Sequence, residues 1–407
     1  MTDIINIIPK MLTGEELDKA LEVLPEYDNA IREKSVPERL VALQDIYKIY
    51  VPGNMTREIY TKMYLSLLRS LQKKQSILAV RQYSENSKMI RQKSYESIIG
   101  GSDSFTIIGE SGIGKSSSVS RAVNLLCDVP VFEIGNTNII PCLQVQAPAD
   151  SSIKGLLLEV LRKADEVLGT RYHENAIRSH STTDMLIGTV SQIALNHIGL
   201  LIVDEIQNVV NSKNGRNIVG ALTQLINNSG VSVAMVGTPE CTLFFEQAFM
   251  LARRSLGLNY SSMEYSDEFK NFCRIILQYC YVNESVVVNE ELFLWLYNHS
   301  KGNASVVANL IHDGQEMAIL EGTERLDIAI LTKAFESRMT MLHDFLTSKK
   351  IKASLLKKNK TEKPTVRENY IGDNISILEI SSNAKKSGCN IVSELKKMGI
   401  EILEVAI

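Results

Sequence analysis

The residues from Gly109 to Ser116 read G-E-S-G-I-G-K-S and match the phosphate-binding loop pattern G-x-x-x-x-G-K-[ST] at every fixed position. The apolar segment Phe105–Ile108 precedes this loop, and a stretch with a helical pattern follows from Lys115 to about Leu126. A strand, a loop and a helix in this order are the setting that the motif requires. The glycines let backbone N–H groups face a β-phosphate, and the helix N-terminus adds partial positive charge. The sequence therefore predicts a site for ATP or GTP.

Within this loop the pattern predicts distinct roles for individual side chains. Lys115 is expected to reach the β- and γ-phosphates, and the Ser116 hydroxyl to help hold Mg²⁺. The predicted nucleotide-binding residues are Gly109, Glu110, Ser111, Gly112, Ile113, Gly114, Lys115, Ser116 and Ser117.

A second motif is the continuous apolar run Gly199–Val203, which ends in the two carboxylates of Asp204 and Glu205. Such a run is typical of a buried central strand in a parallel sheet, and these sheets bind ligands at the carboxyl ends of their strands. Asp204 is therefore predicted to bind Mg²⁺ through water, and Glu205 to polarise the water that attacks the γ-phosphate. Many buried strands end in an acidic turn, but this one follows the phosphate loop by about ninety residues. The adjacent carboxylates favour hydrolysis over simple nucleotide binding.

A third apolar segment, Val231–Gly237, is followed by Thr238. Alone, Thr238 is typical of a turn residue that ends a strand; beside the acidic strand, it is placed to orient the attacking water. The order of phosphate loop, acidic strand and polar-tipped strand is typical of AAA+ ATPases. The predicted fold is of the α/β class: an AAA+ P-loop NTPase whose parallel sheet is flanked by helices, with a small helical lid, a helical N-terminal extension and a basic C-terminal tail.

Composition sets limits on function. The 407 residues suggest about two to three domains, and the net charge of −3 gives no argument for nucleic-acid binding from overall basicity. No apolar stretch reaches the ~18 residues needed to span a membrane, and the N-terminus lacks a signal-peptide pattern. The six cysteines form no C-x-x-C pair and the histidines are scattered, so we expect reduced thiols, no zinc site and a cytoplasmic location.

Four regions are predicted along the chain. Residues 1–94 are expected to form a helical N-terminal extension, and residues 95–255 an AAA+ nucleotide-binding α/β core. Residues 256–340 are expected to form a helical lid, and residues 341–407 a basic flexible tail with a small C-terminal docking element. Within the core, Pro141–Val145 is expected to form another strand. Asp150 is expected to cap a helix over Ile153–Leu168.

Two basic clusters flank the predicted core and lid. The first carries seven cations between Arg69 and Lys93, with Glu85 as its one acidic residue. A solvated helix face is the commoner meaning of such a cluster, and a nucleic-acid or partner contact is the alternative. The second lies between Lys349 and Arg367 and reads as a flexible linker. It either contacts DNA phosphates, in which case binding weakens steeply with salt, or stays solvated.

The chain resembles the TnsC/TniB family of AAA+ regulators of Tn-type DNA transposition. The resemblance covers roughly residues 35–340, and phosphate loops alone would not specify it. The phosphate-loop stretch at residues 105–116 is one part of the resemblance. Two more specific stretches complete it: residues 146–155 with 168–170, and residues 236–240 with 249–254.

This resemblance implies an ATP-dependent assembly. Members form rings or helical filaments on double-stranded DNA with ATP bound, and hydrolysis disassembles the polymer. They connect a TniQ/TnsD-like target selector to a TnsB-like transposase, sometimes with a TnsA-like nuclease. Lys115, Ser116, Asp204, Glu205 and Thr238 match the family's phosphate-loop, acidic-strand and first-sensor positions.

The resemblance also implies residues at interfaces. Arg253 and Arg254 match an arginine pair at the subunit boundary, where one would act as an arginine finger on the neighbouring γ-phosphate; the alternative is an exposed helical pair. Lys154 lies where family members direct side chains toward the DNA backbone, although a lysine at a helix start is usually just solvated. Thr182 and Thr183 lie further along and are further candidates for DNA contact.

One departure from the AAA+ pattern concerns the lid. Many AAA+ ATPases carry an arginine there after a Gly-rich turn, whereas Ser300–Val306 contains none. Lys301 is a candidate substitute, but an ammonium lacks the forked geometry of a guanidinium, and a surface lysine is the simpler interpretation. We therefore expect slow hydrolysis.

Two other functions are alternatives to a transposition regulator. They are another DNA-loading AAA+ ATPase, of the helicase-loader or initiator type, and a nucleotide-gated scaffold or signalling ATPase.

Overall fold

A computed structural model gives the fold of most of the chain. The chain divides into two compact units, Met1–Arg338 and Met339–Ile407. The second unit, with the predicted basic tail, lies outside the described residues, as does most of the first basic cluster. The described residues are 8–75, 104–134, 137–148, 152–210, 215–242 and 256–338.

The apolar runs of the sequence form a six-stranded sheet in the order β2-β3-β4-β5-β1-β6. All neighbouring strands are parallel except the edge pair of β2 and β3, which is antiparallel. The predicted α/β fold with a parallel sheet flanked by helices is confirmed, and β2 adds one antiparallel strand at the edge. The strands are β1 (Phe105–Gly109), β2 (Phe132–Ile134), β3 (Thr137–Gln146), β4 (Ile198–Asp204), β5 (Ser232–Gly237) and β6 (Leu256–Tyr260).

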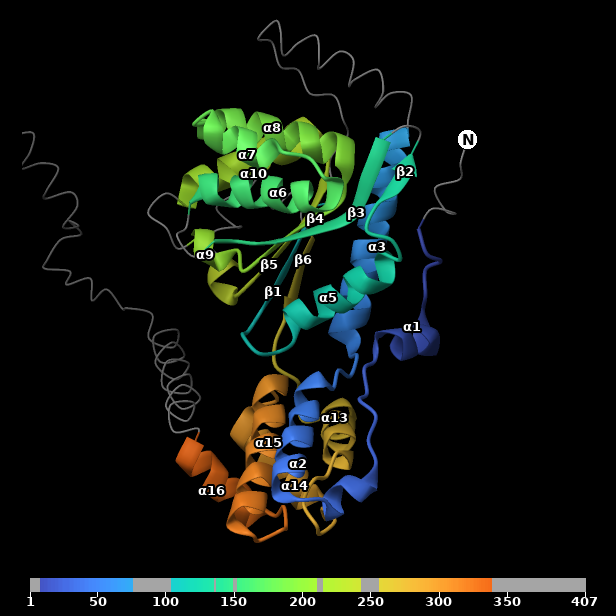
Figure 1. Ribbon diagram of the computed structural model, residues 1–407, viewed down its shortest axis with the longest axis vertical. Helices are drawn as coiled ribbons and strands as arrows, with labels where there is room; N and C mark the ends of the chain where they lie inside the picture. The colour runs from blue at the N-terminus through green and yellow to red at the C-terminus, as the bar shows by residue number, and fades with distance from the viewer. Residues whose placement is uncertain are drawn as a thin grey trace, which may run out of the picture. The chain divides into compact units, whose positions relative to one another are not determined.

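Helices cover both faces of this sheet (Figure 1). Side chains of β4 alternate between two apolar clusters: Leu201 and Val203 face one, and Leu200 and Ile202 face the other. This alternation makes every residue of β4 buried, as its continuous apolar run requires. The first cluster is covered by α6 (Ile153–Leu168), α7 (Tyr172–Arg178), α8 (Thr183–His197) and α10 (Gly215–Ser229), and the second by α1 (Gly14–Leu21), α3 (Asn54–Gln75) and α5 (Lys115–Leu126).

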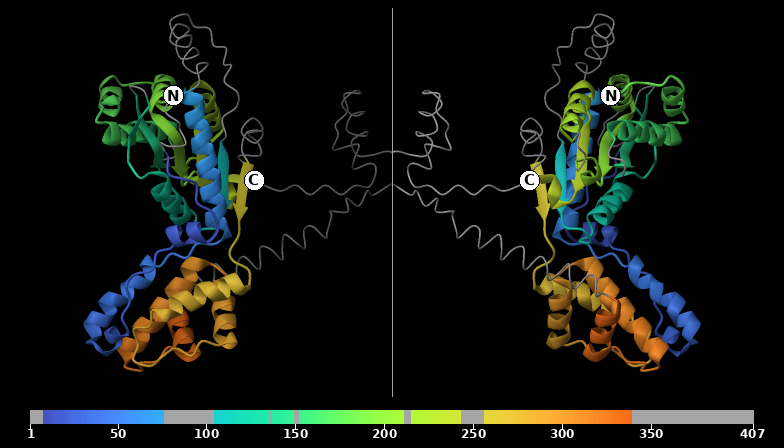
Figure 2. Two further views of the ribbon diagram at one scale, coloured as in Figure 1. Left: turned by 90° about the vertical axis from the view of Figure 1, so that its right-hand side faces the viewer. Right: turned by 90° about the vertical axis from the view of Figure 1, so that its left-hand side faces the viewer.

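The lid is helical and includes part of the N-terminal segment. In Figure 2 the N-terminal segment, in blue, lies beside the orange lid helices. Arg32 Nε donates to the Val282 carbonyl at 2.8 Å, and the Tyr279 hydroxyl donates to the Pro25 carbonyl at 3.0 Å. The elements concerned are η2 (Asn29–Glu33), α2 (Val36–Ala42), η3 (Leu43–Lys48), α13 (Asp267–Gln278), α14 (Glu290–Ser300), α15 (Ala304–Glu321) and α16 (Ile328–Arg338).

The observed elements differ from the expected regions in two places. The range 1–94 was expected to form one extension, but α2 packs on the lid whereas α3 packs on the sheet. β6 pairs with β1 and extends the sheet to Tyr260, inside the range expected for the lid. The lid helices therefore begin at Asp267.

Ile153–Leu168 forms a helix as predicted, but its cap is different. The N-cap is Ser152, whose Oγ accepts a hydrogen bond of 2.8 Å from the Gly155 N–H. The expected cap, Asp150, lies outside the described residues. Either side chain type satisfies a free N–H of the first turn, so the sequence alone did not distinguish them. The predicted strand Pro141–Val145 lies within the longer β3.

None of the helices in the part of the chain that the structure describes has the length and apolar character needed to cross a membrane.

Candidate nucleotide-binding site

The phosphate loop connects the end of β1 to the start of α5. Gly112 and Gly114 have φ angles of 82° and 95°, in the left-handed region that favours glycine. At Gly109 a Cβ atom would lie 2.8 Å from the Tyr260 carbonyl, so the loop requires glycine where it passes the end of β6. The loop is therefore shaped by backbone conformations and close approaches that larger residues would disturb.

Lys115 is the first residue of α5, and its ammonium lies against the phosphate loop. Its side chain is 9% exposed, and its Nζ donates to the carbonyls of Gly109 at 2.8 Å and Glu110 at 2.7 Å. Burial lowers the pKa of the Lys115 ammonium, and the nearby carboxylates of Glu205 and Asp204 oppose this shift. Phosphate oxygens are stronger acceptors than these carbonyls. The ammonium is therefore suited to give up its hydrogen bonds to the carbonyls and bind phosphate oxygens instead.

The two carboxylates follow the buried strand β4. Asp204 is 8% exposed, and its Oδ1 accepts a hydrogen bond of 2.8 Å from the Glu205 N–H. Glu205 has a φ of 55°, a left-handed conformation that is unfavourable for a residue with a side chain. The conformation is held from β5, because the Ile206 N–H donates to the Val236 carbonyl at 3.0 Å. Backbone strain of this kind is typical of functional sites.

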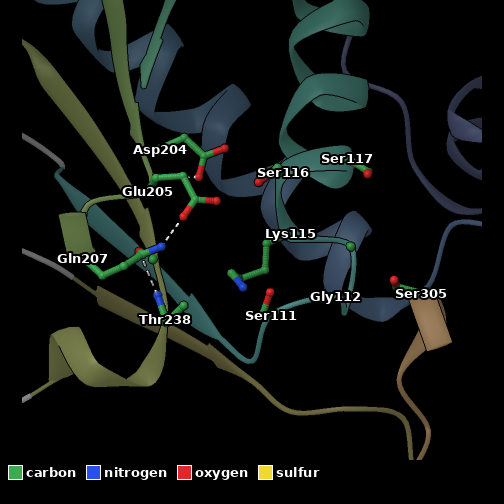
Figure 3. Close-up of a pocket in the computed structure, with 12 residues that line it drawn as sticks. Ser111, Gly112, Lys115, Ser116, Ser117, Asp204, Glu205, Gln207, Thr238 and Ser305 are labelled. Atoms are coloured by element: carbon green, nitrogen blue, oxygen red, sulfur yellow. Dashed lines mark hydrogen bonds between the residues drawn. The ribbon is translucent and has the colours of Figure 1, made fainter. Parts of the chain in front are cut away.

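Side chains from the loop, from β4 and from β5 line one cavity of about 250 Å³ (Figure 3). Six predicted nucleotide-binding residues lie there, together with Asp204, Glu205 and Thr238, whereas the predicted residues Gly109, Glu110 and Ile113 do not line it. The full lining is Ser111, Gly112, Gly114, Lys115, Ser116, Ser117, Asp204, Glu205, Gln207, Gly237, Thr238 and Ser305.

Two of these residues suit a magnesium ion. Ser116 offers a hydroxyl and Asp204 a carboxylate, and Mg²⁺ prefers such oxygen ligands together with water and substrate phosphates. They come from opposite sides of the cavity, from the start of α5 and the end of β4 (Figure 3). The donor set therefore fits an ion that bridges protein and phosphate.

Thr238 follows the last residue of β5, next to the acidic strand. Its backbone N–H donates to Gln207 Oε1 at 3.3 Å. Its Oγ1 is buried and has no hydrogen-bond partner among the described residues. A buried hydroxyl without a partner is costly, and here it belongs to a residue that lines the cavity.

The lid contributes two polar residues that the sequence did not reveal. Asn303 Nδ2 donates to the Ser111 carbonyl at 2.8 Å, and the Ser305 N–H donates to the Gly112 carbonyl at 3.1 Å. Asn303 also caps α15, through a bond from the Val306 N–H to its Oδ1. An asparagine before an apolar helix is a recognisable cap signal, but its second bond depends on tertiary contact.

Lys301, the candidate substitute for a lid arginine, is placed differently. It ends α14 in a left-handed conformation, with a φ of 54°, and its side chain is exposed. It lines neither the phosphate cavity nor the cavity next to it. Among the described lid residues, the one that lines the phosphate cavity is Ser305, which is uncharged.

A second cavity, of about 810 Å³, adjoins the first and shares Gly112, Gly114, Ser117 and Ser305 with it. The segment from Ile49 to Arg57, the end of β6, and helices α13 and α15 form most of its other walls. A nucleotide held by its phosphates in the first cavity has space for its nucleoside here. No local pattern predicts this N-terminal wall, because the segment precedes the phosphate loop by about fifty residues.

Tyr50 is a well-fixed part of that wall. Its hydroxyl shares hydrogen bonds with Thr56 Oγ1 at 2.7 Å and with Ser118 Oγ at 2.9 Å. Burial raises the pKa of Tyr50 above its ordinary value, so the phenol stays neutral. These bonds join the N-terminal segment to α5, the helix that follows the phosphate loop.

The residues predicted for DNA contact lie at helix starts. Lys154 is the second residue of α6 and is exposed. Thr182 is the N-cap of α8, where its Oγ1 accepts from the Met185 N–H at 3.4 Å, and Thr183 is the first residue of that helix. Arg253 and Arg254 lie outside the described residues.

Comparison with known proteins gives a family for the core. Residues 99–245 match the family described as "AAA domain". This match spans the phosphate loop, the acidic strand and Thr238, and it supports an AAA+ class for the nucleotide-binding domain. No curated protein sequence matches the chain.

Several solved structures are similar to this chain at a low level. Aeropyrum pernix ORC1 in complex with DNA has a TM-score of 0.44 and 15% identity, over 74% of this chain and 79% of that chain. Drosophila ORC bound to DNA has a TM-score of 0.44 and 13% identity, over 97% of this chain and 85% of that chain. The Thermotoga maritima RuvB Holliday junction branch migration motor has a TM-score of 0.38 and 12% identity, over 85% of this chain and 88% of that chain. Similarity at this level defines no function for the chain.

Proposed function

We propose that the protein is an ATPase that binds Mg²⁺-ATP between its core and lid and hydrolyses it slowly. One observation carries the proposal: Lys115, Ser116, Asp204, Glu205 and Thr238, which lie at or beyond the carboxyl ends of three neighbouring strands, line a single cavity. An ammonium, two carboxylates and two hydroxyls in one such cavity are the groups that phosphoryl transfer to water requires.

Each residue has a chemical part in the proposed reaction. Lys115 binds the β- and γ-phosphates, and Ser116 and Asp204 hold the magnesium ion, which supplies charge neutralisation at the phosphates. Glu205 accepts the proton of the attacking water, and Thr238 orients that water through its unpartnered hydroxyl. The absence of an arginine between Ser300 and Val306 supports slow turnover, because a sensing cation is missing at the start of α15.

We further propose that ATP drives assembly of the protein on double-stranded DNA, and that the assembly regulates transposition. The support is the resemblance of residues 105–116, of 146–155 with 168–170, and of 236–240 with 249–254 to the TnsC/TniB family. In this proposal Arg253 or Arg254 acts on the ATP of a neighbouring subunit. Lys154, Thr182 and Thr183 contact the DNA backbone: Lys154 is exposed, and the capping bond of Thr182 uses an acceptor lone pair and leaves its O–H free to donate.

The proposed partners follow from the same resemblance. They are a TniQ/TnsD-like target selector and a TnsB-like transposase, and some members of that family also act with a TnsA-like nuclease. Hydrolysis would disassemble the polymer and so limit where insertion occurs.

Imaging by negative-stain electron microscopy tests the proposal. The protein is mixed with double-stranded DNA and ATP, a non-hydrolysable analogue or ADP. We expect rings or filaments on DNA with the triphosphates and none with ADP. The variant Glu205→Gln should stay assembled with ATP, and Lys115→Ala should not assemble.

Other outcomes separate the parts of the proposal. Discrete particles that ignore both DNA and nucleotide would contradict the assembly role and favour a scaffold or signalling ATPase. Assembly on DNA that recruits a replicative helicase instead of a transposase in a pull-down would support the DNA-loading alternative. Absence of phosphate release from ATP, with or without DNA, would contradict the ATPase itself.

A further inference from the structure

Gln207, the first residue of α9 (Gln207–Val210), connects the two residues proposed to handle the attacking water. Its Nε2 donates a hydrogen bond to Glu205 Oε2, and its Oε1 accepts a bond of 3.3 Å from the Thr238 N–H (Figure 3). A carboxylate only accepts and a backbone N–H only donates, so the two partners fix the orientation of the amide. Gln207 thus joins the end of β4 to the end of β5.

The backbone around Gln207 is built to keep this side chain in place. Ile206, the residue before it, is tied to β5 by its bond to the Val236 carbonyl. At Gly237 a Cβ atom would lie 2.7 Å from Ile206 Cγ2 and 3.2 Å from Gln207 Oε1. Glycine at the end of β5 therefore leaves the space in which the amide reaches Thr238.

Glu205 depends on this bond more than its neighbours do. Its backbone is fixed in the left-handed region, but its side chain has three rotatable bonds. Within the described ranges, the bond from Gln207 is the one hydrogen bond that its carboxylate accepts. Because the bond holds Oε2, the other oxygen is left to face the cavity and accept a proton from water.

We infer that Gln207 is a positioning residue for ATP hydrolysis, which holds the Glu205 carboxylate toward the attacking water and keeps it in register with Thr238. The inference rests on the proposed ATPase function. A displacement of about 1 Å in a catalytic group can cost up to about a hundredfold in rate. Among the described residues, the side chain of Gln207 bonds to Glu205 and Thr238 and to neither the phosphate loop nor the lid, so its loss should affect turnover and leave nucleotide binding intact.

Three variants of the full chain test this inference. Gln207→Met keeps the length of the side chain and removes both bonds. Gln207→Glu keeps an acceptor for the Thr238 N–H but places a like charge against Glu205. Asn208→Ala is the matched control, because it removes a neighbouring amide whose Nδ2 donates to the Ala147 carbonyl at 3.1 Å, away from Glu205.

Steady-state hydrolysis with Mg²⁺ and double-stranded DNA gives kcat and KM, and a fluorescent ATP analogue gives the dissociation constant. For Gln207→Met we expect kcat to fall about tenfold to a hundredfold, with KM and nucleotide affinity within about twofold of the unaltered protein. Gln207→Glu should lose at least as much kcat, and Asn208→Ala should change kcat by less than about twofold. A merely structural role would lower the thermal midpoint and the affinity together with kcat.

The outcomes distinguish this inference from the proposed function. Unchanged kcat in Gln207→Met, beside a large loss in Glu205→Gln, would overturn the inference and leave the ATPase intact. Weaker nucleotide binding with unchanged kcat would also overturn it, because Gln207 would then serve binding. No turnover in the unaltered protein would overturn the proposed function, and the inference with it.

Discussion

Arg39 and Glu324 form a two-pronged ion pair between segments that lie 285 residues apart in the sequence. Arg39 Nη1 lies 2.5 Å from Glu324 Oε2, and Nη2 lies 2.6 Å from Oε1. Arg39 is 3% exposed and also donates to the Tyr281 carbonyl at 3.1 Å. The pair fixes α2 of the N-terminal segment to the lid. Because the segment continues from α2 into the wall of the nucleoside cavity, the lid and that wall are joined.

Replacing Glu324 with Gln should destabilise the protein by about 3 kcal/mol, because the charge of Arg39 stays buried without a counter-charge. Chemical denaturation at neutral pH measures the loss. The matched control is Glu321→Gln, which breaks the exposed pair between Glu321 and Lys333 in the same lid. We expect less than about 1 kcal/mol there. Equal losses from the two variants would show that burial of Arg39 does not matter.

The same pair predicts a dependence of stability on pH. Hydrogen bonds from Arg39 lower the pKa of Glu324 below its ordinary value of 4.5 in the folded state. The pair therefore contributes its full stability above that ordinary value, and the contribution is lost as pH falls through the lowered folded-state pKa. Denaturation curves at pH 7, 5, 4 and 3 should show the unaltered protein losing more stability than Glu324→Gln. Parallel losses would contradict this prediction.

The part of the site that could be predicted from sequence is the part built from local rules. The loop from Gly109 to Ser116 needs glycines and a lysine at fixed spacing, and the run that ends at Asp204 needs continuous apolar residues to be buried on both faces. Each of these two patterns lies within one continuous stretch of the sequence. The strands at the centre of the sheet were therefore predicted to within one or two residues.

The rest depends on contacts between distant segments. Asn303 is recognisable as a cap, but its bond to the Ser111 carbonyl joins residues 192 apart. The N-terminal wall of the nucleoside cavity is similar, since no local pattern tells a lid-packing helix such as α2 from a sheet-packing helix such as α3. Gln207 is the exception, because it lies two residues after Glu205 and could have been considered as its neighbour.

Asn303→Ala should weaken ATP binding about threefold to tenfold, the size expected for one lost hydrogen bond between lid and loop. It should also lower stability by about 1 kcal/mol through loss of the α15 cap. Asn289→Ala is the control, because Asn289 caps α14 by accepting from the Leu292 N–H at 2.8 Å. This control should lose similar stability and keep its ATP affinity. Calorimetric titration with ATP compares the two variants. Equal ATP affinities would show that Asn303 has no part in nucleotide binding.

Gly302→Ala should destabilise the protein by more than about 3 kcal/mol. Gly302 has a φ of 75°, and a Cβ atom there would lie 1.8 Å from the Met263 carbonyl oxygen, which belongs to backbone. Gly322 is a matched control with a φ of 71° and open space around its Cβ position. Gly322→Ala should therefore cost only the left-handed strain, about 1–2 kcal/mol. Thermal unfolding separates the two effects, and a similar cost at both sites would mean that the Met263 segment moves easily.

Thr238→Val tests whether the unpartnered hydroxyl at the end of β5 serves the reaction. Valine keeps the shape of the side chain, and the folded protein loses no hydrogen bond, since Thr238 Oγ1 has none among the described residues. We therefore expect stability within about 0.5 kcal/mol of the unaltered protein, or slightly higher, since an unsatisfied buried hydroxyl is removed. The turnover number for ATP should nevertheless fall about tenfold or more, because the hydroxyl that we propose to orient the attacking water is lost.

Thr238→Ser restores the hydroxyl without the methyl group and should recover most of the turnover. If Thr238 were only a residue that ends a strand, the valine variant would lose no activity, and the serine variant would behave no better than valine. If the hydroxyl acts on the water, the variants with an oxygen atom at position 238 (Thr and Ser) should be active. Stability should instead depend on how many methyl groups the side chain keeps. That separation of the two measurements is what distinguishes a reacting group from a well-packed turn at this position.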